Sequence, residues 1–323
     1  MWILSRSTAS KRVSGSVKGI DLCQSYSGRE ARSLDKNNQY GIREIQEKLL
    51  EILIYYKKFC ESHNLRFVLA GGTCLGAARE HGMIPWDDDV DVFMLREDYE
   101  KLIPLWNQYA DTEHYSCLRS NDQINIHHSV TEIRDNNTTF ILKHNVDNDI
   151  HQGLMIDVIP LDDVANSRAR RTAQVLSALV FDCYNFQRMP EHKGRLVTLA
   201  TRVALNMVKS FDGRYRIWKR AERRIIAESR HRSGLVASFM EGPKIMRDRF
   251  PRKWVEDPVF LDFEGIKMPV LRGYKKWLAM SYGNYMKKPP EKERKLRHKI
   301  VFYDMNHSYQ KYKGIYYCKK ARQ

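Results

Sequence analysis

The spacing of apolar residues predicts two amphipathic helices and a buried strand in the first third of the chain. Residues 41–63 and 98–110 carry apolar side chains at steps of three and four, with polar residues between them, a spacing typical of helices that pack on one face. Between these two segments, the short and mostly apolar run LRFVLA at residues 65–70 predicts a buried strand that ends at a pair of glycines.

Further strands are predicted downstream. Residues 115–119, 124–134 and 138–142 have the composition of short strands separated by turns rich in Asn and Asp. The run GLMIDVIPL at residues 153–161 is dense in apolar side chains and predicts a central strand. Its only carboxylate, Asp157, is costly to bury unless it is paired or binds a metal ion.

The pattern divides the chain into four parts. Residues 1–38 show no apolar period and predict a disordered basic leader. Residues 39–165 hold the helices and strands of a catalytic core, and residues 166–250 are basic, poor in Gly and Pro, and predict a helical lobe or insertion. Residues 251–323 begin with short β segments and a short helix, and are expected to complete the core domain.

The composition is that of a globular protein with a real core, but the charge is unevenly spread. The 323 residues are 42% hydrophobic and carry a formal net charge of +16. Residues 168–253 contain 21 Lys/Arg and 7 Asp/Glu, and residues 286–323 contain 12 and 3, so the rest of the chain is net acidic. Such basic regions suit anionic ligands, including phosphates and the surface of an anionic membrane.

Two absences narrow the class of protein. No window reaches 18 apolar residues without charge, so the sequence predicts no membrane span. The six cysteines form no C-x-x-C pair, which argues against a zinc knuckle and favours a reducing, cytoplasmic setting. A cytoplasmic protein with peripheral contact at the inner face of a membrane is the expectation.

A glycine pair follows the first predicted strand. Gly71 and Gly72 allow a sharp turn and a close approach of the backbone to a ligand. Thr73 is predicted to cap a helix that starts at Cys74, whose free N–H groups would face a phosphate. Arg79, near the end of that helix, is a further predicted phosphate contact.

Four acids within five residues predict a divalent-metal site. Asp87, Asp88, Asp89 and Asp91 repel one another unless a cation neutralises them. The alternation at residues 89–92 predicts a strand, on which Asp89 and Asp91 share a face, Asp87 reaches that face, and Asp88 points away. Hard oxygen ligands at this spacing suit Mg²⁺ or Mn²⁺. If the 153–161 strand lies beside this one, Asp157 joins the site as a third ligand or as a general base.

These motifs resemble the LicD family. Residues 71–91, GGTCLGAAREHGMIPWDDDVD, resemble its signature G-G-T-x-L-G-x-x-R-x-x-x-x-I-P-W-D-D-D-x-D. GLMIDVIPLD resembles its second block, and the stretch from Phe263 through YGNYMKKPP to Arg294 and His298 resembles its C-terminal block. The resemblance runs over residues 41–303, and residues 162–249 are its least distinctive part.

The resemblance implies a fold and a reaction. The fold would be of the α/β (α+β) class, a nucleotidyltransferase-like mixed sheet flanked by helices. The reaction would move a substituted phosphate, typically phosphocholine, from a CDP-activated donor to a sugar hydroxyl of lipopolysaccharide, teichoic acid or capsule. Asp87, Asp89 and Asp91 match the family's metal-binding acids, and the segment 71–73 matches its phosphate turn. A glycan or glycolipid acceptor is implied, and no nucleic-acid partner is expected.

Two positions give no support to this scheme. The family often has Lys where this chain has Glu132, two residues before Arg134-Asp135, so the donor group or its orientation could differ. His127 and His128 are adjacent, would face opposite sides of a strand, and are not predicted to share a metal.

Two other functions remain open. The same acids could serve a nucleotidyltransferase that attacks the α-phosphate of a nucleoside triphosphate and releases pyrophosphate. The basic lobe could instead belong to a non-catalytic module that binds anionic glycolipids.

Overall fold

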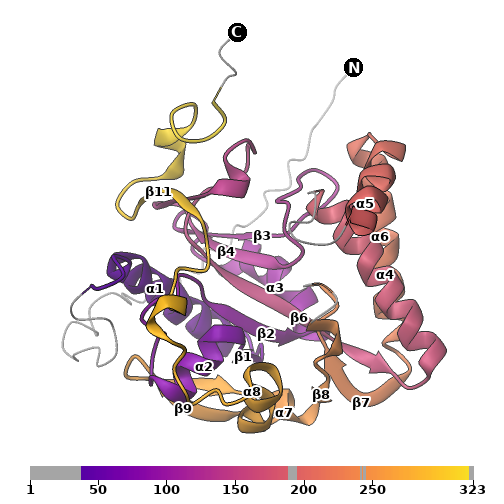
Figure 1. Ribbon diagram of the computed structural model, residues 1–323, viewed down its shortest axis with the longest axis horizontal. Helices are drawn as coiled ribbons and strands as arrows, with labels where there is room; N and C mark the ends of the chain where they lie inside the picture. Colours follow the sequence, from indigo (N-terminus) through magenta and orange to yellow (C-terminus); the bar gives the residue numbers. More distant parts are fainter. Residues whose placement is uncertain (1–37, 188–194, 241, 243–244, 320–323) are drawn as a thin grey trace, which may run out of the picture. The chain divides into compact units, whose positions relative to one another are not determined.

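The computed structural model describes residues 38–187, 195–240, 242 and 245–319. The chain folds into a mixed sheet flanked by helices (Figure 1), which confirms the predicted fold class. The predicted leader lies outside the described residues, apart from Asn38. Within the described ranges, no helix combines the length and the hydrophobicity that a transmembrane span requires.

The main sheet has the strand order β3-β4-β6-β2-β1-β10-β9, and β7 and β8 extend it from the far end of β6. Its strands pair antiparallel except for β2 with β6 and β1 with β10. The strands are β1 (Phe67–Leu69), β2 (Asp91–Leu95), β3 (Tyr115–Leu118), β4 (Thr131–Asp135), β6 (Met155–Ala165), β7 (Arg232–Ala237), β8 (Phe250–Pro251), β9 (Val259–Phe263) and β10 (Ile266–Val270).

The long strand β6 is the centre of this arrangement. Its first half pairs with β2 on one side and β4 on the other, and its second half pairs with β7. Helix α1 (Arg43–Ser62) packs against β4 and β6, and α3 (Arg96–Tyr109) packs against β2, β3 and β6. The apolar stripe of α1 that predicted a packing helix is buried, with Ile45, Leu49 and Ile52 fully excluded from solvent.

The C-terminal segment completes the core. Strand β10 forms a hairpin with β9 and pairs in parallel with β1, so residues about 200 apart in sequence are neighbours in the sheet. Helix α8 (Tyr274–Tyr282) follows the short α7 (Lys253–Glu256). Strand β11 (Ile300–Asp304), which the pattern did not predict, pairs with β5 (Thr139–Leu142) in a separate two-stranded sheet.

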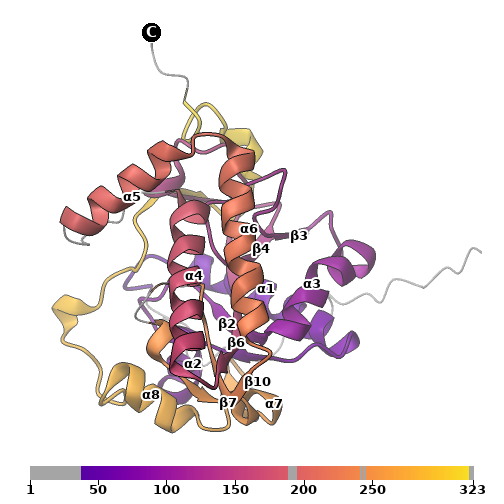
Figure 2. The ribbon, with the colours of Figure 1, turned by 90° about the vertical axis from the view of Figure 1, so that its right-hand side faces the viewer.

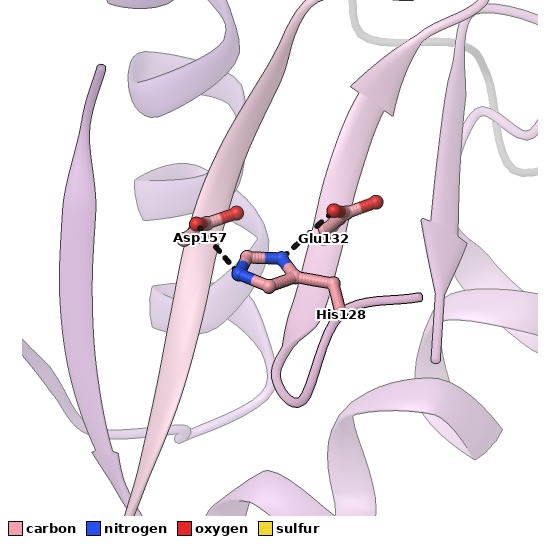
Figure 3. A group of neighbouring side chains, drawn as sticks. All are labelled: His128, Glu132 and Asp157. Atoms are coloured by element: carbon pink, nitrogen blue, oxygen red, sulfur yellow. Dashed lines mark hydrogen bonds and ion pairs between the residues drawn. The ribbon is translucent and has the colours of Figure 1, made fainter. Parts of the chain in front are cut away.

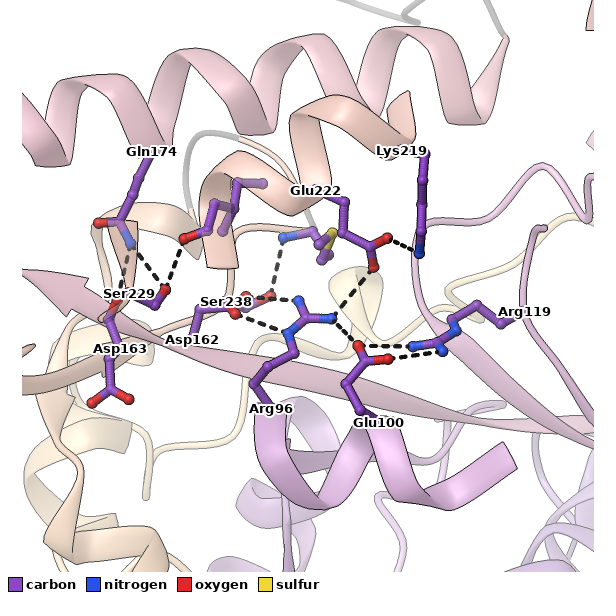
Figure 4. Close-up of polar contacts among 12 residues, drawn as sticks. Arg96, Glu100, Arg119, Asp162, Asp163, Gln174, Lys219, Glu222, Ser229 and Ser238 are labelled. Carbon is purple, nitrogen blue, oxygen red and sulfur yellow. Dashed lines mark hydrogen bonds and ion pairs between the residues drawn. The ribbon is translucent and has the colours of Figure 1, made fainter. Parts of the chain in front are cut away.

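The basic lobe consists of α4 (Arg168–Phe186), α5 (Arg195–Met207) and α6 (Phe211–Glu228). Helices α4 and α6 run side by side, and α5 crosses near their ends (Figure 2). Arg96 on α3 joins α6 to β6 because its guanidinium contacts Asp162 at 2.7–2.8 Å and Glu222 at 3.5 Å (Figure 4). Gln174 on α4 donates to the Asp163 carbonyl at 2.9 Å. The helices are therefore fastened to the same strand that carries Asp157.

Three predicted boundaries are wrong. The strand expected at residues 124–134 is regular only from Thr131, because an irregular loop precedes it. The strand expected at residues 89–92 begins at Asp91, so Asp89 belongs to the loop before it. Helix α2 (Gly71–Arg79) begins at Gly71 rather than Cys74, with Ala70 as its N-cap residue.

Candidate active site

Three carboxylates lie in one row across neighbouring strands. Asp91 on β2 pairs in register with Asp157 on β6, and Asp157 pairs in register with Glu132 on β4. Residues opposite each other on adjacent strands place their side chains on the same face of a sheet. The predicted neighbourhood of the Asp91 and Asp157 strands is therefore confirmed, although 66 positions separate these residues in the sequence.

The two glycines of α2 lie against two of the acids. A Cβ on Gly71 would stand 2.7 Å from Asp91 Oδ2, and a Cβ on Gly72 would stand 2.5 Å from Asp87 Oδ2. Gly71 also has a φ of +49°, which side chains disfavour. The absence of Cβ atoms thus lets both carboxylates approach the positive N-terminus of the helix.

Thr73 positions β2 instead of capping the helix. Its Oγ1 accepts a hydrogen bond from the Asp91 backbone N–H at 2.9 Å, and α2 has no side-chain cap. The Ala70 N–H donates to the Asp91 carbonyl at 2.9 Å. Both backbone groups of Asp91 are therefore held by the start of α2, which sets where its carboxylate lies.

The loop between α2 and β2 carries the other acids. Buried Gln46 on α1 donates to the carbonyls of Ile84 and Asp87, at 3.0 and 2.9 Å, and these hydrogen bonds hold the loop against α1. Burial and the nearby Asp89 raise the pKa of the Asp87 carboxyl well above its usual value. Carboxylates this close favour a bound cation, since protonation is the alternative.

Asp88 is the buried acid of this loop, and it contacts the C-terminal segment. It is 1% exposed, and its two oxygens accept from the backbone N–H of His298 at 3.2 Å and from its Nδ1 at 3.1 Å. One oxygen lies within 4.8 Å of oxygens of Asp87 and Asp89. Because both Asp88 oxygens are occupied by His298, we assign Asp88 to positioning that C-terminal histidine.

The C-terminal segment also supplies a cation. Arg297 Nε lies 3.4 Å from Asp89 Oδ2, and Arg297 Nη1 lies 3.9 Å from Asp91 Oδ2. The Arg297 side chain is 56% exposed, so it can move away when another cation or a phosphate enters. Tethering by the neighbouring His298 keeps Arg297 beside the acids.

Two recesses, each of about 350 Å³, meet at these residues. The Trp86 recess is lined by Gly72, Arg79, Trp86, Asp87, Tyr285, Lys287 and Arg297, among others. The Trp277 recess is lined by Gly71, Asp91, Phe93, Asp248, Phe250, Trp277, Tyr282 and Arg297, among others. Arg297 and Tyr282 border both recesses, and the glycine pair divides them. The acids thus lie between a basic recess and an aromatic, acidic one.

Arg79 lies in the Trp86 recess, but it is not directed at the acids. Its Nε pairs with Glu80 at 2.8 Å, and its Nη1 donates to the Tyr285 carbonyl at 3.1 Å. Arg294 and Arg79 lie 5.4 and 6.0 Å from the centre of the Trp86 ring. Arg79 therefore shapes the wall of this recess, and its predicted phosphate contact stays a prediction.

Part of the chain matches a known protein family. Residues 64–168 match the family model described as LicD/FKTN/FKRP, nucleotidyltransferase domain. The chain has a LicD-family domain. That span includes α2, the acidic loop, β2 and β6, the elements that bring the candidate residues together.

Relatives extend the similarity beyond this domain. The chain is 28% identical over 286 residues to lipopolysaccharide cholinephosphotransferase LicD of Haemophilus influenzae, with 80% of this chain and 96% of that protein covered. It is also 36% identical over 56 residues to an uncharacterized protein of Rickettsia prowazekii, with 16% of this chain and 21% of that protein covered. The similarity to the first relative covers 80% of the chain and therefore extends beyond the LicD-family domain at residues 64–168.

A histidine joins the carboxylate row of this LicD-family domain (Figure 3). His128 Nδ1 lies 2.9 Å from Glu132 Oε1, and its Nε2 lies 3.7 Å from Asp157 Oδ2. Arg134 Nε donates to the second oxygen of Glu132 at 2.6 Å. His128 stands on the loop before β4 rather than on a strand, so the argument from alternation that dismissed it does not apply.

The electrostatics of the row differ at its two ends. Burial raises the pKa of Asp157 to about 6, and the negative charges of Glu132 and Asp89 add to this effect. Burial also opposes ionisation of Glu132, but Arg134 and His128 outweigh it and lower the pKa of Glu132 to about 2. Glu132 is therefore an ionised structural partner of Arg134. The burial of Asp157, in contrast, is not balanced by its contacts, since its buried Oδ1 lacks a hydrogen-bond partner among the described residues.

The donor set fits a divalent cation. Asp87, Asp89 and Asp91 offer carboxylate oxygens, Arg297 lies beside Asp89 and Asp91, and Asp157 has an oxygen without a hydrogen-bond partner among the described residues. Magnesium and manganese favour carboxylate oxygens and keep positions for substrate phosphates. The arrangement can therefore hold such an ion beside the N-terminus of α2.

Sequence reasoning missed two residues of this site. Arg297 belongs to the C-terminal block of the resemblance, and its neighbour His298 was noted there, so a signal for it existed. His128 had no such signal, because its contact with Asp157 depends on the register of β4 against β6.

Proposed function

We propose that this protein transfers phosphocholine from CDP-choline to a sugar hydroxyl of a lipopolysaccharide-type glycan. The observation that carries the proposal is the gathering of Asp87, Asp89, Asp91 and Asp157 between two recesses, next to the N-terminus of α2. The similarity to a lipopolysaccharide cholinephosphotransferase over 80% of the chain supports the same reaction. That relative's name also favours lipopolysaccharide over teichoic acid or capsule as the acceptor class.

The two recesses differ as the two ends of CDP-choline differ. The Trp86 recess, with Arg79 and Lys287, offers cations for phosphate and an aromatic ring for a base. The Trp277 recess offers aromatic side chains and Asp248, which suit a trimethylammonium group. With CMP in the first and choline in the second, the phosphorus to be attacked lies between them, where the acids and the glycine pair meet.

In this arrangement the chain's own groups bind and orient the diphosphate. The N–H groups of the first turn of α2 face phosphate oxygens, and Arg297 moves from Asp89 and Asp91 to a phosphate oxygen. Mg²⁺ or Mn²⁺, held by Asp87, Asp89, Asp91 and Asp157, would offset the charge that develops on the leaving CMP. The acceptor hydroxyl attacks the phosphorus that carries choline, the P–O bond to CMP breaks, and the hydroxyl proton passes to a base.

Asp157 or His128 could serve as the base that accepts the proton of the acceptor hydroxyl. We assign Asp157 to metal binding, with the alternative that its Oδ2, next to His128 Nε2, accepts the acceptor proton. The protein would act at the inner face of the cytoplasmic membrane, where a CDP-activated donor and a lipid-linked glycan meet.

Product analysis tests the reaction. Purified full-length protein is incubated with CDP-choline, Mg²⁺ and a lipopolysaccharide acceptor, and nucleotide products are separated by chromatography. Release of CMP together with choline-modified glycan is expected. Release of pyrophosphate from a nucleoside triphosphate would support a nucleotidyltransferase instead, and acceptor binding without divalent ion or donor consumption would support a non-catalytic module.

Donor selectivity tests the assignment of the recesses. Asp248→Asn removes the carboxylate charge from the Trp277 recess but leaves a group that can contact Ser281, which lies 3.3 Å from Asp248 Oδ2. We expect a KM for CDP-choline at least fivefold higher and an unchanged KM for an uncharged analogue such as CDP-glycerol, because a cation–carboxylate contact is lost. An equal change for both donors would refute the choline assignment.

A further inference from the structure

A groove rich in arginine lies outside the site described above. It has a volume of about 560 Å³ and lies where the start of α4 meets the segment after β7. Its basic side chains are Arg168 and Arg171 from α4 and Arg247 and Arg249 from the segment before β8. Its apolar lining comes from Val164, Val175, Leu176, Phe239 and Met246. The groove therefore combines cations with an apolar wall.

The charge of this groove is uncompensated within the described chain. Other arginines nearby have acidic partners: Arg170 pairs with Glu228, and both Arg232 and Arg252 pair with Asp163. No described carboxylate pairs with the four groove arginines. The acid between two of them, Asp248, instead lines the Trp277 recess and accepts from Ser281. A ligand with several negative charges would complement this groove.

An exposed apolar stripe continues from the groove along α4. Its outward residues recur at helical spacing after Arg168 and Thr172, while the opposite face, with Gln174, Ala178 and Phe181, is buried against the protein. Leu176 is 57% exposed, and Leu179 and Val180 are each 40% exposed. Contiguous exposed apolar side chains on a helix mark an interaction site more often than isolated ones do.

Helix α5, which neighbours α4, also exposes apolar side chains. Leu199, Val203 and Met207 recur every four residues on α5 and are exposed. Helix α5 contacts α4, and Figure 2 shows both helices on the same side of the lobe. Tyr184 on α4 donates to the Ala204 carbonyl on α5 at 3.1 Å, which holds the two helices together.

The groove adjoins the candidate active site through one segment of chain. Ser238, Ile245, Asp248 and Phe250 line the Trp277 recess, whereas Phe239, Met246, Arg247 and Arg249 line the groove. Residues of this one segment thus line both hollows. A molecule held in the groove would lie directly across this segment from the catalytic carboxylates.

We propose that the groove arginines and the apolar stripe of α4 form a docking surface for an anionic phospholipid membrane. Guanidinium groups bind lipid phosphates in a bidentate manner, and Leu176, Leu179 and Val180 enter the boundary between headgroups and acyl chains. Aliphatic side chains distinguish this surface from single-stranded nucleic-acid sites, which use aromatic rings for stacking. Resting on the proposed function, this docking places the active site beside a lipid-linked acceptor.

Vesicle sedimentation tests the docking. Full-length protein is mixed with vesicles of phosphatidylcholine alone or with 30% phosphatidylglycerol, at low ionic strength and at about 1 M salt. We expect binding to the anionic vesicles only, and much weaker binding at high salt. Arg168→Gln combined with Arg171→Gln should weaken this binding by roughly 30-fold. Leu176→Gln should weaken it severalfold at unchanged charge.

A matched control separates this surface from the general basicity of the protein. Lys267→Gln combined with Lys311→Gln removes the same charge from exposed positions on β10 and the C-terminal segment, and should retain binding within about twofold. Thermal unfolding of each variant establishes that it is folded. Millimolar inorganic phosphate should not displace the protein from vesicles, because it offers no apolar phase for the stripe.

Several outcomes would overturn the proposal. Equal binding to both vesicle types, or equal losses of binding in the arginine and lysine variants, would do so. Displacement of the protein from vesicles by inorganic phosphate would also do so. So would a protein that does not bind vesicles but retains an RNA oligonucleotide through Arg168 and Arg171. Vesicle binding requires no turnover, so failure of phosphocholine transfer would leave it measurable. Conversely, the arginine variant should keep full transfer to a soluble, delipidated acceptor.

Discussion

At the scale of single residues, the candidate site depends on what two glycines lack. Gly71 and Gly72 leave the space that Asp91 Oδ2 and Asp87 Oδ2 occupy, and this brings two negative groups to the start of α2. From the sequence alone, a glycine pair after a strand indicates a tight turn and a ligand. The structure shows that carboxylate oxygens occupy the space that a side chain would need at each glycine.

Gly72→Ala tests this close approach. The added methyl group would stand 2.5 Å from Asp87 Oδ2, so the carboxylate must move, and we expect transfer to fall at least 100-fold while the protein stays folded. Thermal unfolding and initial rates are measured in a cycle with Asp87→Ala. If the clash is the cause, Gly72→Ala should lower Tm less in the Asp87→Ala background than in the natural chain.

The acids make a second prediction, on metal removal. Asp91→Asn should abolish transfer, and a chelator should do the same to the natural protein without unfolding it, because the carboxylates lie at the edge of an intact core. Saturating Mg²⁺ or Mn²⁺ should raise Tm in the natural chain, since a ligand bound only by the folded state stabilises it, and should not in Asp91→Asn.

Asp212→Asn removes the charge of an exposed acid on α6 that pairs with Arg216; this variant is the control and should behave like the natural chain. Metal-dependent turnover in Asp91→Asn would contradict the assignment of the site.

At the scale of elements, a buried ion network ties the lobe to the catalytic sheet. Arg96 at the start of α3 makes a bidentate contact with fully buried Asp162 on β6, and also reaches Glu222 on α6 and Glu100 one turn later in α3 (Figure 4). Arg119 contacts the same Glu100 at 3.1 Å. The network thus joins α3 and α6 to the strand that carries Asp157.

Asp162→Asn should lower the free energy of unfolding by about 3 kcal/mol or more, because it leaves the buried Arg96 without its principal charge partner. Urea denaturation measures this change. The exposed pair of Asp212 with Arg216 serves as a comparison, and Asp212→Asn should cost less than about 1 kcal/mol. If Asp162→Asn also lowered the free energy of unfolding by less than about 1 kcal/mol, the buried ion network would contribute little to stability.

At the scale of the whole molecule, the C-terminal segment closes onto the core through a histidine. His151 packs against Tyr309 with ring centres 4.2 Å apart, accepts at Nδ1 from the Gly153 N–H at 3.0 Å, and lies 2.8 Å from Asn136 through Nε2. Burial, helped by the positive charge of Arg134, lowers the pKa of His151 to about 3. The folded protein therefore keeps this imidazole neutral.

This predicts acid sensitivity with a defined sign. The unfolded chain binds a proton at His151 below about pH 6.5, whereas the folded chain does not until about pH 3, so the free energy of unfolding falls as pH decreases across that window. The loss approaches about 1.4 kcal/mol per pH unit at most. Urea denaturation from pH 7 to pH 4.5 measures it.

His151→Gln should be less stable at pH 7, with a flatter profile in acid, because it removes the titrating group. His114→Gln, at an exposed position, should keep the natural slope. Parallel profiles for His151→Gln and the natural chain would exclude this histidine as the cause.

Local pattern was sufficient for much of this protein. Three–four spacing predicted α1 and α3, and dense apolar runs predicted β1 and β6, because burial on one or both faces leaves a period in the sequence. The acids at residues 87–91 indicated a cation site, since nearby carboxylates need neutralising whatever the fold around them.

Tertiary structure decided which distant residues meet. The registers of β2, β4 and β6 place Asp91, Asp157 and Glu132 in one row and set His128 beside it, and the C-terminal segment brings Arg297 to the acids. Strand β11 was missed because its partner, β5, is remote in sequence. Sequence patterns record what each segment buries, but not which segment covers it, because pairing and register arise from packing of the whole core.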